Sequence, residues 1–384
     1  MQPEQPGRRL IHVITPGDHF SPSTGSATVS VVHGLSLATP SGRPRPAVVV
    51  AEGTYPDRYP SAEVIEYRQR STRGSDRYVD LVGSRLGTGR RRARARYAAA
   101  LPDQDSWDPA FVIGHNAVQL MAAVDARRHV PVLYAHNDLL RSYSRRESGR
   151  ALGSASAIIA VSDYLADRLR SALPEALRDR VETVGNGVDA AAFQAPLRES
   201  RGRLEIVLVG RMVPEKGVDV LLEALVRLDR ADIHTTIIGS EGFDPASVLS
   251  DYQRMLRRTA AGLGDAVDFL PFQPRARIAQ LLSSADVVVV PSRWPEPFAL
   301  TVLEGMAAGA AVVASDVGGI PEAAGGAAML VPPGDADLLA QALASLADDE
   351  PLLRAMQRAA RERALQRDWG VVARELDAVL VRHR

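Results

Sequence analysis

Residues 204–217 read LEIVLVG followed by RMVPEKG, and this stretch decides the fold. Apolar side chains follow one another from Ile206 to Val209 without alternation, which is typical of a strand covered by helices on both faces. A glycine, a polar turn and a helix-length segment come next. The stretch therefore predicts a buried strand, a tight loop and a helix, in that order.

Short apolar runs alternate with helix-length segments along the whole chain. The runs expected to form strands are residues 10–15, 47–51, 111–114, 131–135, 157–161, 181–184, 204–209, 235–238, 267–270, 286–290, 311–314 and 328–331. Helices between strands are expected over residues 217–228, 246–263 and 278–284. This order predicts an α/β protein with two doubly wound, Rossmann-like domains. Ligands of such sheets bind beyond the carboxyl ends of the strands, so we expect the domains to face each other across a cleft.

The domain boundary is expected in a polar stretch without periodicity, residues 195–203 (APLRESRGR). It divides the chain into a first domain of residues 1–197 and a second of residues 198–367. The total of 384 residues fits two domains, since a domain holds roughly 150 residues.

Composition excludes several classes of protein. Lysine and arginine number 46 and so do aspartate and glutamate, so bulk charge does not predict nucleic-acid binding. There is no cysteine, which excludes disulfides, thiolate metal sites and a cysteine nucleophile. No apolar run approaches the ~20 residues that cross a bilayer, and the N-terminus does not resemble a signal peptide. These observations predict a cytoplasmic protein without a transmembrane segment.

Lys216 is the only lysine among the 46 basic residues, and it lies in the turn after strand 204–209. Lysine is a compact point charge and arginine a planar fork, so the two are not equivalent at a crowded anionic site. Gly210, Arg211 and Lys216 precede a helix whose N-terminus carries a partial positive charge. This combination predicts a diphosphate site.

A second candidate site begins after strand 286–290, where residues 291–309 read PSRWPEPFALTVLEGMAAG. Glu296 lies in the loop, and Glu304 follows eight residues later in a helix expected to start near Ala299. Each carboxylate accepts several hydrogen bonds, so the pair is suited to holding sugar hydroxyls.

Other chemistry finds no support in the sequence. There is no G-x-x-x-x-G-K-[ST], no H-E-x-x-H and no G-x-S-x-G. The aspartate pairs at residues 103/105 and 335/337 are interpreted as structural, so no metal site is predicted. The basic run 90–96 (RRRARAR) is interpreted as a solvated helix face, and an anionic membrane surface stays open as the alternative.

With these residues in view, the sequence resembles the retaining glycosyltransferases of the GT-B fold, family four, which use nucleotide sugars. Glu296 and Glu304 match the family's E-x7-E motif, and residues 210–217 match its G-R-x-x-x-x-K-G motif. Further matches cover most of the chain: Gly25 in a glycine loop, residues 114–116 (GHN), 135–138 (AHND), 186–189 (NGVD) and 317–322 (VGGIPE), and Trp369. Trp369 implies a last helix, residues 368–384, that crosses back to the first domain.

The resemblance implies a role for each matching residue. Arg211 and Lys216 neutralise the diphosphate, Glu304 accepts from the ribose, and Glu296 holds the transferred sugar. The implied catalytic residues are His136, Arg211, Lys216 and Glu296. The implied donor-binding residues are Gly25, Gly210, Arg211, Lys216, Phe272, Glu296, Phe298, Ala299, Leu300 and Glu304. His115 is interpreted as a core or loop histidine.

The implied reaction moves a hexose-type sugar from a UDP-sugar to a hydroxyl acceptor, with retention and without a metal or cofactor. A small molecule, a glycan and a glycolipid stay open as acceptors, and so do the oligomeric state and peripheral contact with a membrane. A sugar-nucleotide epimerase or another nucleotide-sugar enzyme of the same fold stays open as an alternative, and so does a silent sugar-nucleotide binding module. A dehydrogenase is disfavoured, because residues 15–19 (TPGDH) follow the first strand in place of G-x-G-x-x-G.

Two positions depart from the family pattern. Gly25 is followed by Ser26 where many members have a second glycine, and Ala299 stands where glycine or cysteine is common. Both departures concern contacts expected with the donor.

Overall fold

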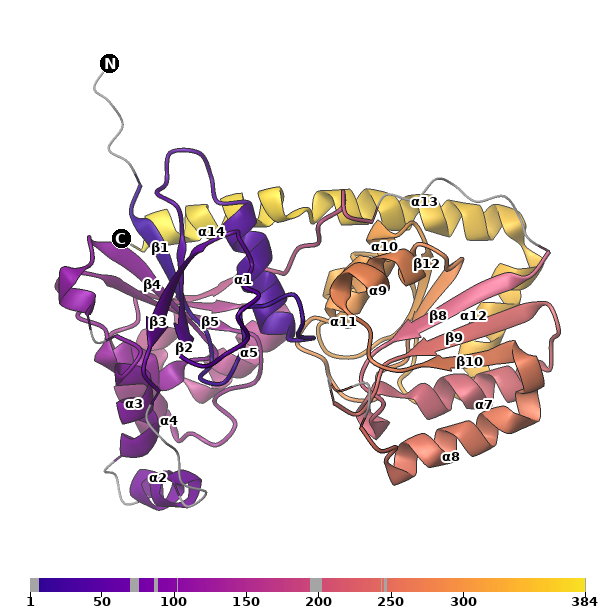
Figure 1. Ribbon diagram of the computed structural model, residues 1–384, viewed down its shortest axis with the longest axis horizontal. Helices are drawn as coiled ribbons and strands as arrows, with labels where there is room; N and C mark the ends of the chain where they lie inside the picture. The colour runs from indigo at the N-terminus through magenta and orange to yellow at the C-terminus, as the bar shows by residue number, and fades with distance from the viewer. Residues whose placement is uncertain are drawn as a thin grey trace. The chain divides into compact units, whose positions relative to one another are not determined.

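The computed structural model describes residues 7–69, 76–85, 89–101, 103–193, 202–242, 244 and 247–383. The chain divides into two compact units, Met1–Gly185 with Trp369–Arg384, and Asn186–Asp368 (Figure 1). Each unit is built on a parallel sheet, which confirms the predicted α/β class with two Rossmann-like domains. The predicted boundary after residue 197 stays a prediction, because residues 194–201 lie outside the described part of the chain.

The first unit has a seven-stranded sheet of order β3-β2-β1-β4-β5-β6-β7. Its strands are β1 Arg9–Val13, β2 Ala47–Ala51, β3 Glu63–Tyr67, β4 Ala110–His115, β5 Val130–Ala135, β6 Ala157–Ala160 and β7 Val181–Thr183. Its helices are α1 Ala27–Leu37, α2 Asp76–Arg85, α3 Arg91–Ala98, α4 Arg145–Leu152, α5 Asp163–Ala172, α6 Glu175–Arg178 and α14 Trp369–Arg382, with short 3-10 turns at Gln104–Ser106 and Val118–Ala123. Every residue of β2, β4 and β5 is buried, as expected where helices cover both faces of a sheet.

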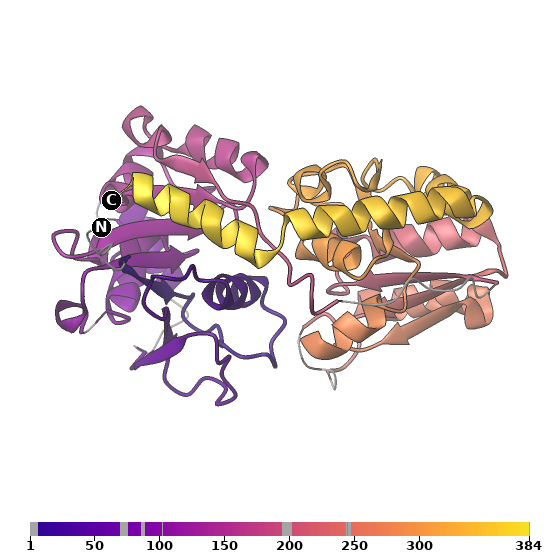
Figure 2. The ribbon, with the colours of Figure 1, turned by 90° about the horizontal axis from the view of Figure 1, so that it is seen from above.

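Helix α14 completes the first unit and lies beside α1 (Figure 2). A Cβ on Gly34 of α1 would lie 2.2 Å from Cε2 of Trp369, so the indole fills a notch that only glycine leaves open. Arg43 forms an ion pair with Asp377. The prediction that the last helix returns to the first domain is confirmed.

The second unit has a six-stranded sheet of order β10-β9-β8-β11-β12-β13. Its strands are β8 Leu204–Val209, β9 Ile233–Ile238, β10 Val267–Leu270, β11 Val287–Val290, β12 Ala311–Ser315 and β13 Met329–Val331. Its helices are α7 Val218–Leu228, α8 Asp251–Ala260, α9 Arg275–Leu282, α10 Leu300–Ala307, α11 Ile320–Ala324, α12 Ala336–Asp348 and α13 Glu350–Gln366, with 3-10 turns at Pro214–Lys216 and Ala261–Ala266. Helices α7 and α12 pack together on one face of the sheet, and α10 packs against α13 on the other (Figure 1).

Each expected strand is present, with ends that differ by at most two residues. Strand β3 (EVIEY) was not expected, because it lies at a sheet edge and buries only Tyr67, so it lacks a buried apolar run. Helix α9 begins at Arg275, directly after Pro274, rather than at residue 278. Helix α8 begins at Asp251 rather than at residue 246, since Ser250 and Gln253 form a capping box there. Within the described ranges, no helix combines the length and the apolar character that crossing a membrane requires.

Candidate functional site

The candidate residues of the second unit lie at the switch point of its sheet. Strand order reverses between β8 and β11, and the loops after these two strands carry residues 210–217 and 291–299. In open α/β sheets, ligands bind at this position, beyond the carboxyl ends of the strands. The fold therefore brings together two motifs that are about eighty residues apart in the sequence.

Lys216 and Glu296 form the centre of this site. The lysine Nζ lies 2.5 Å from Glu296 Oε1, and the hydroxyl of Ser292 donates to the same oxygen at 2.7 Å. Glu296 and Ser292 are buried, whereas the lysine side chain keeps about a quarter of its surface exposed. The carboxylate is thus held in place while the ammonium group retains access from solvent.

Glycines let these loops approach each other closely. Gly217 has a left-handed φ of 67°, and a Cβ there would lie 1.9 Å from the carbonyl oxygen of Pro291. Gly318 has φ 63°, and its Cβ would lie 2.4 Å from the carbonyl oxygen of Glu296, which accepts the N–H of Gly319 at 2.7 Å. Any side chain at Gly217 or Gly318 would therefore displace the loop that positions Glu296.

Arg211 and Gly210 lie at the end of β8. The guanidinium of Arg211 is exposed, and no partner for it is found among the described residues. Gly210 lies beside Lys216, since a Cβ on it would meet the lysine Cγ at 4.0 Å. Two cations therefore lie at this edge of the sheet. Lys216 is paired with Glu296, and Arg211 has no partner among the described residues.

Glu304 lies in α10, is buried, and pairs with a residue that the sequence did not single out. Its Oε1 accepts from Arg275 Nη2 at 2.7 Å, from the first residue of α9. Arg275 is one of many arginines in the chain, and no motif marks it. Phe272, three residues earlier, is half-buried and donates its backbone N–H to Ser240 Oγ at 3.1 Å.

The backbone at the start of α10 explains why glycine is common at position 299 in the family pattern. Ala299 precedes the helix with φ 66° and ψ 83°, a left-handed conformation that favours glycine. Phe298 is buried, and Leu300 is the first helical residue. The Cβ of Ala299 is therefore accommodated at the expense of backbone strain.

In the first unit, Gly25 is exposed in the loop that enters α1. Ser26 is the N-cap of that helix, and its side chain accepts from the N–H of Val29. The serine that replaces a second glycine thus has a capping role.

Three buried histidines form a hydrogen-bonded chain in the first unit. His12 Nδ1 lies 2.9 Å from His115 Nε2, and His115 Nδ1 lies 2.8 Å from His136 Nε2. Desolvation lowers the pKa of His12 to about 4 and that of His136 to about 3. Burial, together with the neighbouring histidines, also lowers the pKa of His115 well below its usual value. All three rings are neutral at pH 7.

The direction of the hydrogen bonds among the three histidines follows from the buried nitrogen of His12. His12 Nε2 is buried without a partner among the described residues, and an unpaired buried donor is rarer than an unpaired acceptor. We therefore assign the protons to Nδ1 of His12 and Nδ1 of His115, so that each ring donates toward His136. His136 then carries its proton on Nδ1. Sequence analysis missed His12, since nothing local marks its partner 103 residues away.

The backbone of His136 is fixed by Asn116, the residue that follows β4. The N–H of His136 donates to Asn116 Oδ1 at 2.7 Å, and Asn116 itself has a left-handed φ of 55°. Asparagine tolerates this conformation better than most residues. Asparagine therefore suits position 116 in two ways: it tolerates the left-handed backbone, and its side chain supplies the acceptor for the N–H of His136.

One of the aspartates interpreted as structural caps a helix. Asp335 is the N-cap of α12 and accepts from the N–H of Leu338. Within the described ranges, no three His, Cys, Asp or Glu side chains come together as a metal site. The basic run 90–96 lies mostly in α3, which has no buried residue.

Comparison with known proteins agrees with this arrangement. A family model described as Glycosyltransferase Family 4 matches residues 11–192, and one described as Glycosyl transferases group 1 matches residues 189–363. The Spore coat protein SA of Bacillus subtilis is 30% identical over 266 residues, covering 64% of this chain and 66% of that protein. The phosphatidyl-myo-inositol mannosyltransferase of Mycolicibacterium smegmatis is 36% identical over 246 residues, covering 62% of this chain and 58% of that protein.

The chain spans about half to two thirds of the length of the curated relatives it matches. A crystal structure of Anabaena Alr3699/HepE in complex with UDP matches with a TM-score of 0.73 at 19% identity, covering 97% of this chain and 100% of that chain. This likeness concerns the fold, and it agrees with the two Rossmann-like units described above.

Proposed function

The chain belongs to family four of the glycosyltransferases, with the GT-B fold, and we propose that it transfers a hexose-type sugar from a UDP-sugar to a hydroxyl acceptor. The proposal includes retention of configuration at the anomeric carbon, independence of a metal ion and a cytoplasmic location. The observation that carries it is the pairing of Lys216 with Glu296 at the switch point of the second sheet, with Arg211 exposed beside them.

The proposal assigns the departing diphosphate to the cations of Arg211 and Lys216. Fixed cations at such a position lower the barrier of a group transfer without a metal. Lys216 has its ammonium group within reach of solvent, and the guanidinium of Arg211 has no described partner to release. In this proposal both neutralise the diphosphate as the bond to the sugar breaks.

The carboxylates hold the two ends of the donor. Glu296 accepts from hydroxyls of the transferred sugar, using the lone pairs that Lys216 and Ser292 leave. Glu304 accepts from the ribose with the oxygen that Arg275 does not occupy. The buried position of both carboxylates makes these hydrogen bonds strong, since few water molecules compete.

The transfer itself uses one face of the sugar. The acceptor hydroxyl attacks the anomeric carbon on the side from which the diphosphate leaves, and a phosphate oxygen of the leaving group takes its proton. No protein nucleophile is assigned. His136 contributes its Nδ1–H as a donor to a sugar oxygen, since the chain from His12 through His115 supplies a donor to its Nε2.

Two comparisons support the donor and acceptor classes. HepE is described in complex with UDP, and a further structure of it in complex with UDP-glucose. The name of the M. smegmatis relative describes mannosylation of phosphatidyl-myo-inositol, so a lipid is among the acceptors to test.

Thermal unfolding with a ligand panel tests the proposal. A ligand that binds only the native state stabilises it by ~2.7 kcal/mol at a hundredfold excess over its Kd. We expect UDP and one UDP-sugar to raise Tm in the presence of EDTA, and the shift to disappear in Lys216→Ala. A shift with GDP or ADP alone would change the donor, and a response to NAD alone would contradict the proposed activity.

A further inference from the structure

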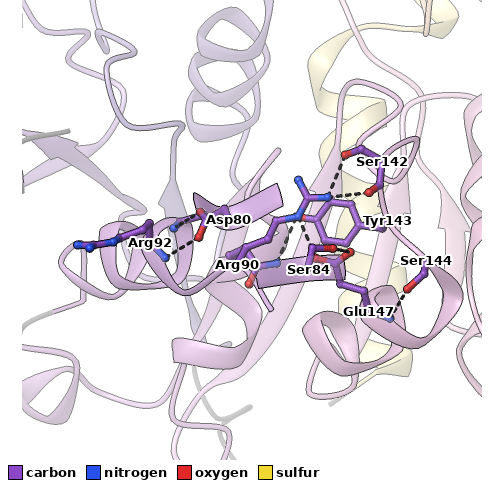
Figure 3. Close-up of polar contacts among 10 residues, drawn as sticks. Asp80, Ser84, Arg90, Arg92, Ser142, Tyr143, Ser144 and Glu147 are labelled. Atoms are coloured by element: carbon purple, nitrogen blue, oxygen red, sulfur yellow. Dashed lines mark hydrogen bonds and ion pairs between the residues drawn. The ribbon is translucent and has the colours of Figure 1, made fainter. Parts of the chain in front are cut away.

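Helix α2 presents its polar side to the protein (Figure 3). Asp80 is buried, and its two carboxylate oxygens accept from the backbone N–H groups of Arg92 and Ala93 at 2.8 Å each. Ser84, one turn later, donates to Glu147 Oε2 at 2.5 Å. Polar groups therefore attach this helix to α3 and α4.

The apolar side chains of the same helix point away from the protein. Tyr78 is 72% exposed, Val79 49%, Leu81 39% and Val82 54%. At 100° per residue these four occupy one side of the helix, opposite Asp80. The arrangement is the reverse of a helix that packs on a core, whose apolar stripe faces inward.

A buried ion pair holds this layer in place. Arg90 Nε lies 2.9 Å from Glu147 Oε1, and both side chains are largely buried. The Arg90 guanidinium also stacks over the Tyr143 ring at 3.8 Å and donates to the carbonyl of Ser142 at 2.7 Å (Figure 3). Glu147 lies in the first turn of α4, which Ser144 caps. Glu147, which accepts from Ser84 of α2, is thus itself held by Arg90.

Arginines gather on α3, the helix beside α2, although Arg92 also lies 4.0 Å from the carboxylate of Asp76 in α2. Helix α3 packs against α2 and contains Arg91, Arg92, Arg94 and Arg96 without an acidic residue. Arg85 adds an exposed charge at the end of α2, while the carboxylate of Asp80 is buried against α3. The chain as a whole has no net charge, so this positive surface is a local concentration.

We propose that the outer sides of α2 and α3 form a docking surface for an anionic lipid bilayer. Apolar side chains on a convex helix enter the boundary between headgroups and acyl chains, and tyrosine is favoured at that depth. The flanking arginines complement anionic headgroups. An anionic bilayer meets both the charged and the apolar parts of this surface. The proposal does not depend on the activity proposed above.

Vesicle co-sedimentation of the whole chain tests it. We expect binding to vesicles of phosphatidylcholine with phosphatidylglycerol, weaker binding at high salt, and little binding to phosphatidylcholine alone. Tyr78→Ser with Val82→Ser should reduce partitioning about tenfold, because two inserted apolar side chains are lost. Arg91→Gln with Arg92→Gln should reduce it by a similar factor and weaken the salt dependence.

The matched control replaces Val226, which is 50% exposed on α7, and its neighbour Arg227 by serine and glutamine. This variant should bind vesicles like the unmodified chain, and all variants should keep its Tm. Equal binding to neutral and anionic vesicles would overturn the proposal, and so would unchanged binding of both α2 and α3 variants. Self-association that Tyr78→Ser with Val82→Ser abolishes, without any vesicle binding, would also overturn it and identify the surface as a contact between copies.

Discussion

The ammonium group of Lys216 lies 2.5 Å from the carboxylate of Glu296, so the only lysine of the chain is paired with a carboxylate of the other motif. The pair joins the loops after two neighbouring strands at the switch point of the sheet. A diphosphate would therefore meet a lysine whose position is already fixed, at the end of a short, glycine-lined loop.

Lys216→Ala should lower kcat by about 10²–10³-fold, the usual effect of removing one fixed group that stabilises developing charge. Lys216→Arg should not restore activity, because the guanidinium is larger than the ammonium group that Glu296 holds, and Gly210 lies beside the stem of the side chain. Steady-state kinetics with a saturating donor measures both effects. Near-normal turnover of Lys216→Ala would exclude the role assigned to the lysine.

Glu304→Ala should raise the KM for the donor about 10- to 100-fold with little change in kcat, since a charge-assisted hydrogen bond contributes about 1.5–3 kcal/mol. Arg275→Ala provides the comparison, because it leaves the Glu304 carboxylate in place and removes only its partner. We expect a smaller rise in KM for that variant. Equal effects of the two substitutions would indicate that Glu304 acts through its ion pair rather than on the nucleotide.

Gly34→Ala should destabilise the first unit by about 1–3 kcal/mol, because the new methyl group overlaps the indole of Trp369. Urea unfolding followed by a probe in that unit measures the loss. Adding Trp369→Leu should recover part of it, so the two substitutions should be non-additive by more than about 0.5 kcal/mol. Strict additivity would show that the contact does not form in solution.

Acid should destabilise the first unit through its histidine chain. The pKa of His12 is about 4 and that of His136 about 3 in the folded state, against 6.5 when unfolded, so the unfolded chain binds more protons between these values. Stability therefore falls as the pH falls below 6.5, by up to about 1.4 kcal/mol per histidine per pH unit. Denaturant titrations at several pH values measure the slope. His12→Phe should reduce it by about a third, and an unchanged slope would contradict this assignment.

The sequence predicted the parts of the fold that depend on local pattern. Continuous apolar runs located the buried strands, and glycine-containing turns located the loops at the switch point. Strand β3 was not predicted, because an edge strand needs no continuous apolar run. The contacts of Arg275 and His12 were not predicted, because their partners are distant in the sequence. Ala299 shows the opposite case, in which the sequence marked a departure from the family pattern and the structure shows the backbone strain that results from it.

The return of α14 to the first unit has a consequence for synthesis of the chain. Residues 186–368 form one uninterrupted unit, which can fold as soon as it has left the ribosome. The first unit emerges earlier, yet its Gly34 notch stays unfilled until Trp369 has been made. We therefore expect the first unit, although it is made first, to finish folding only after Trp369 has been made, and to expose apolar surface on α1 throughout that interval.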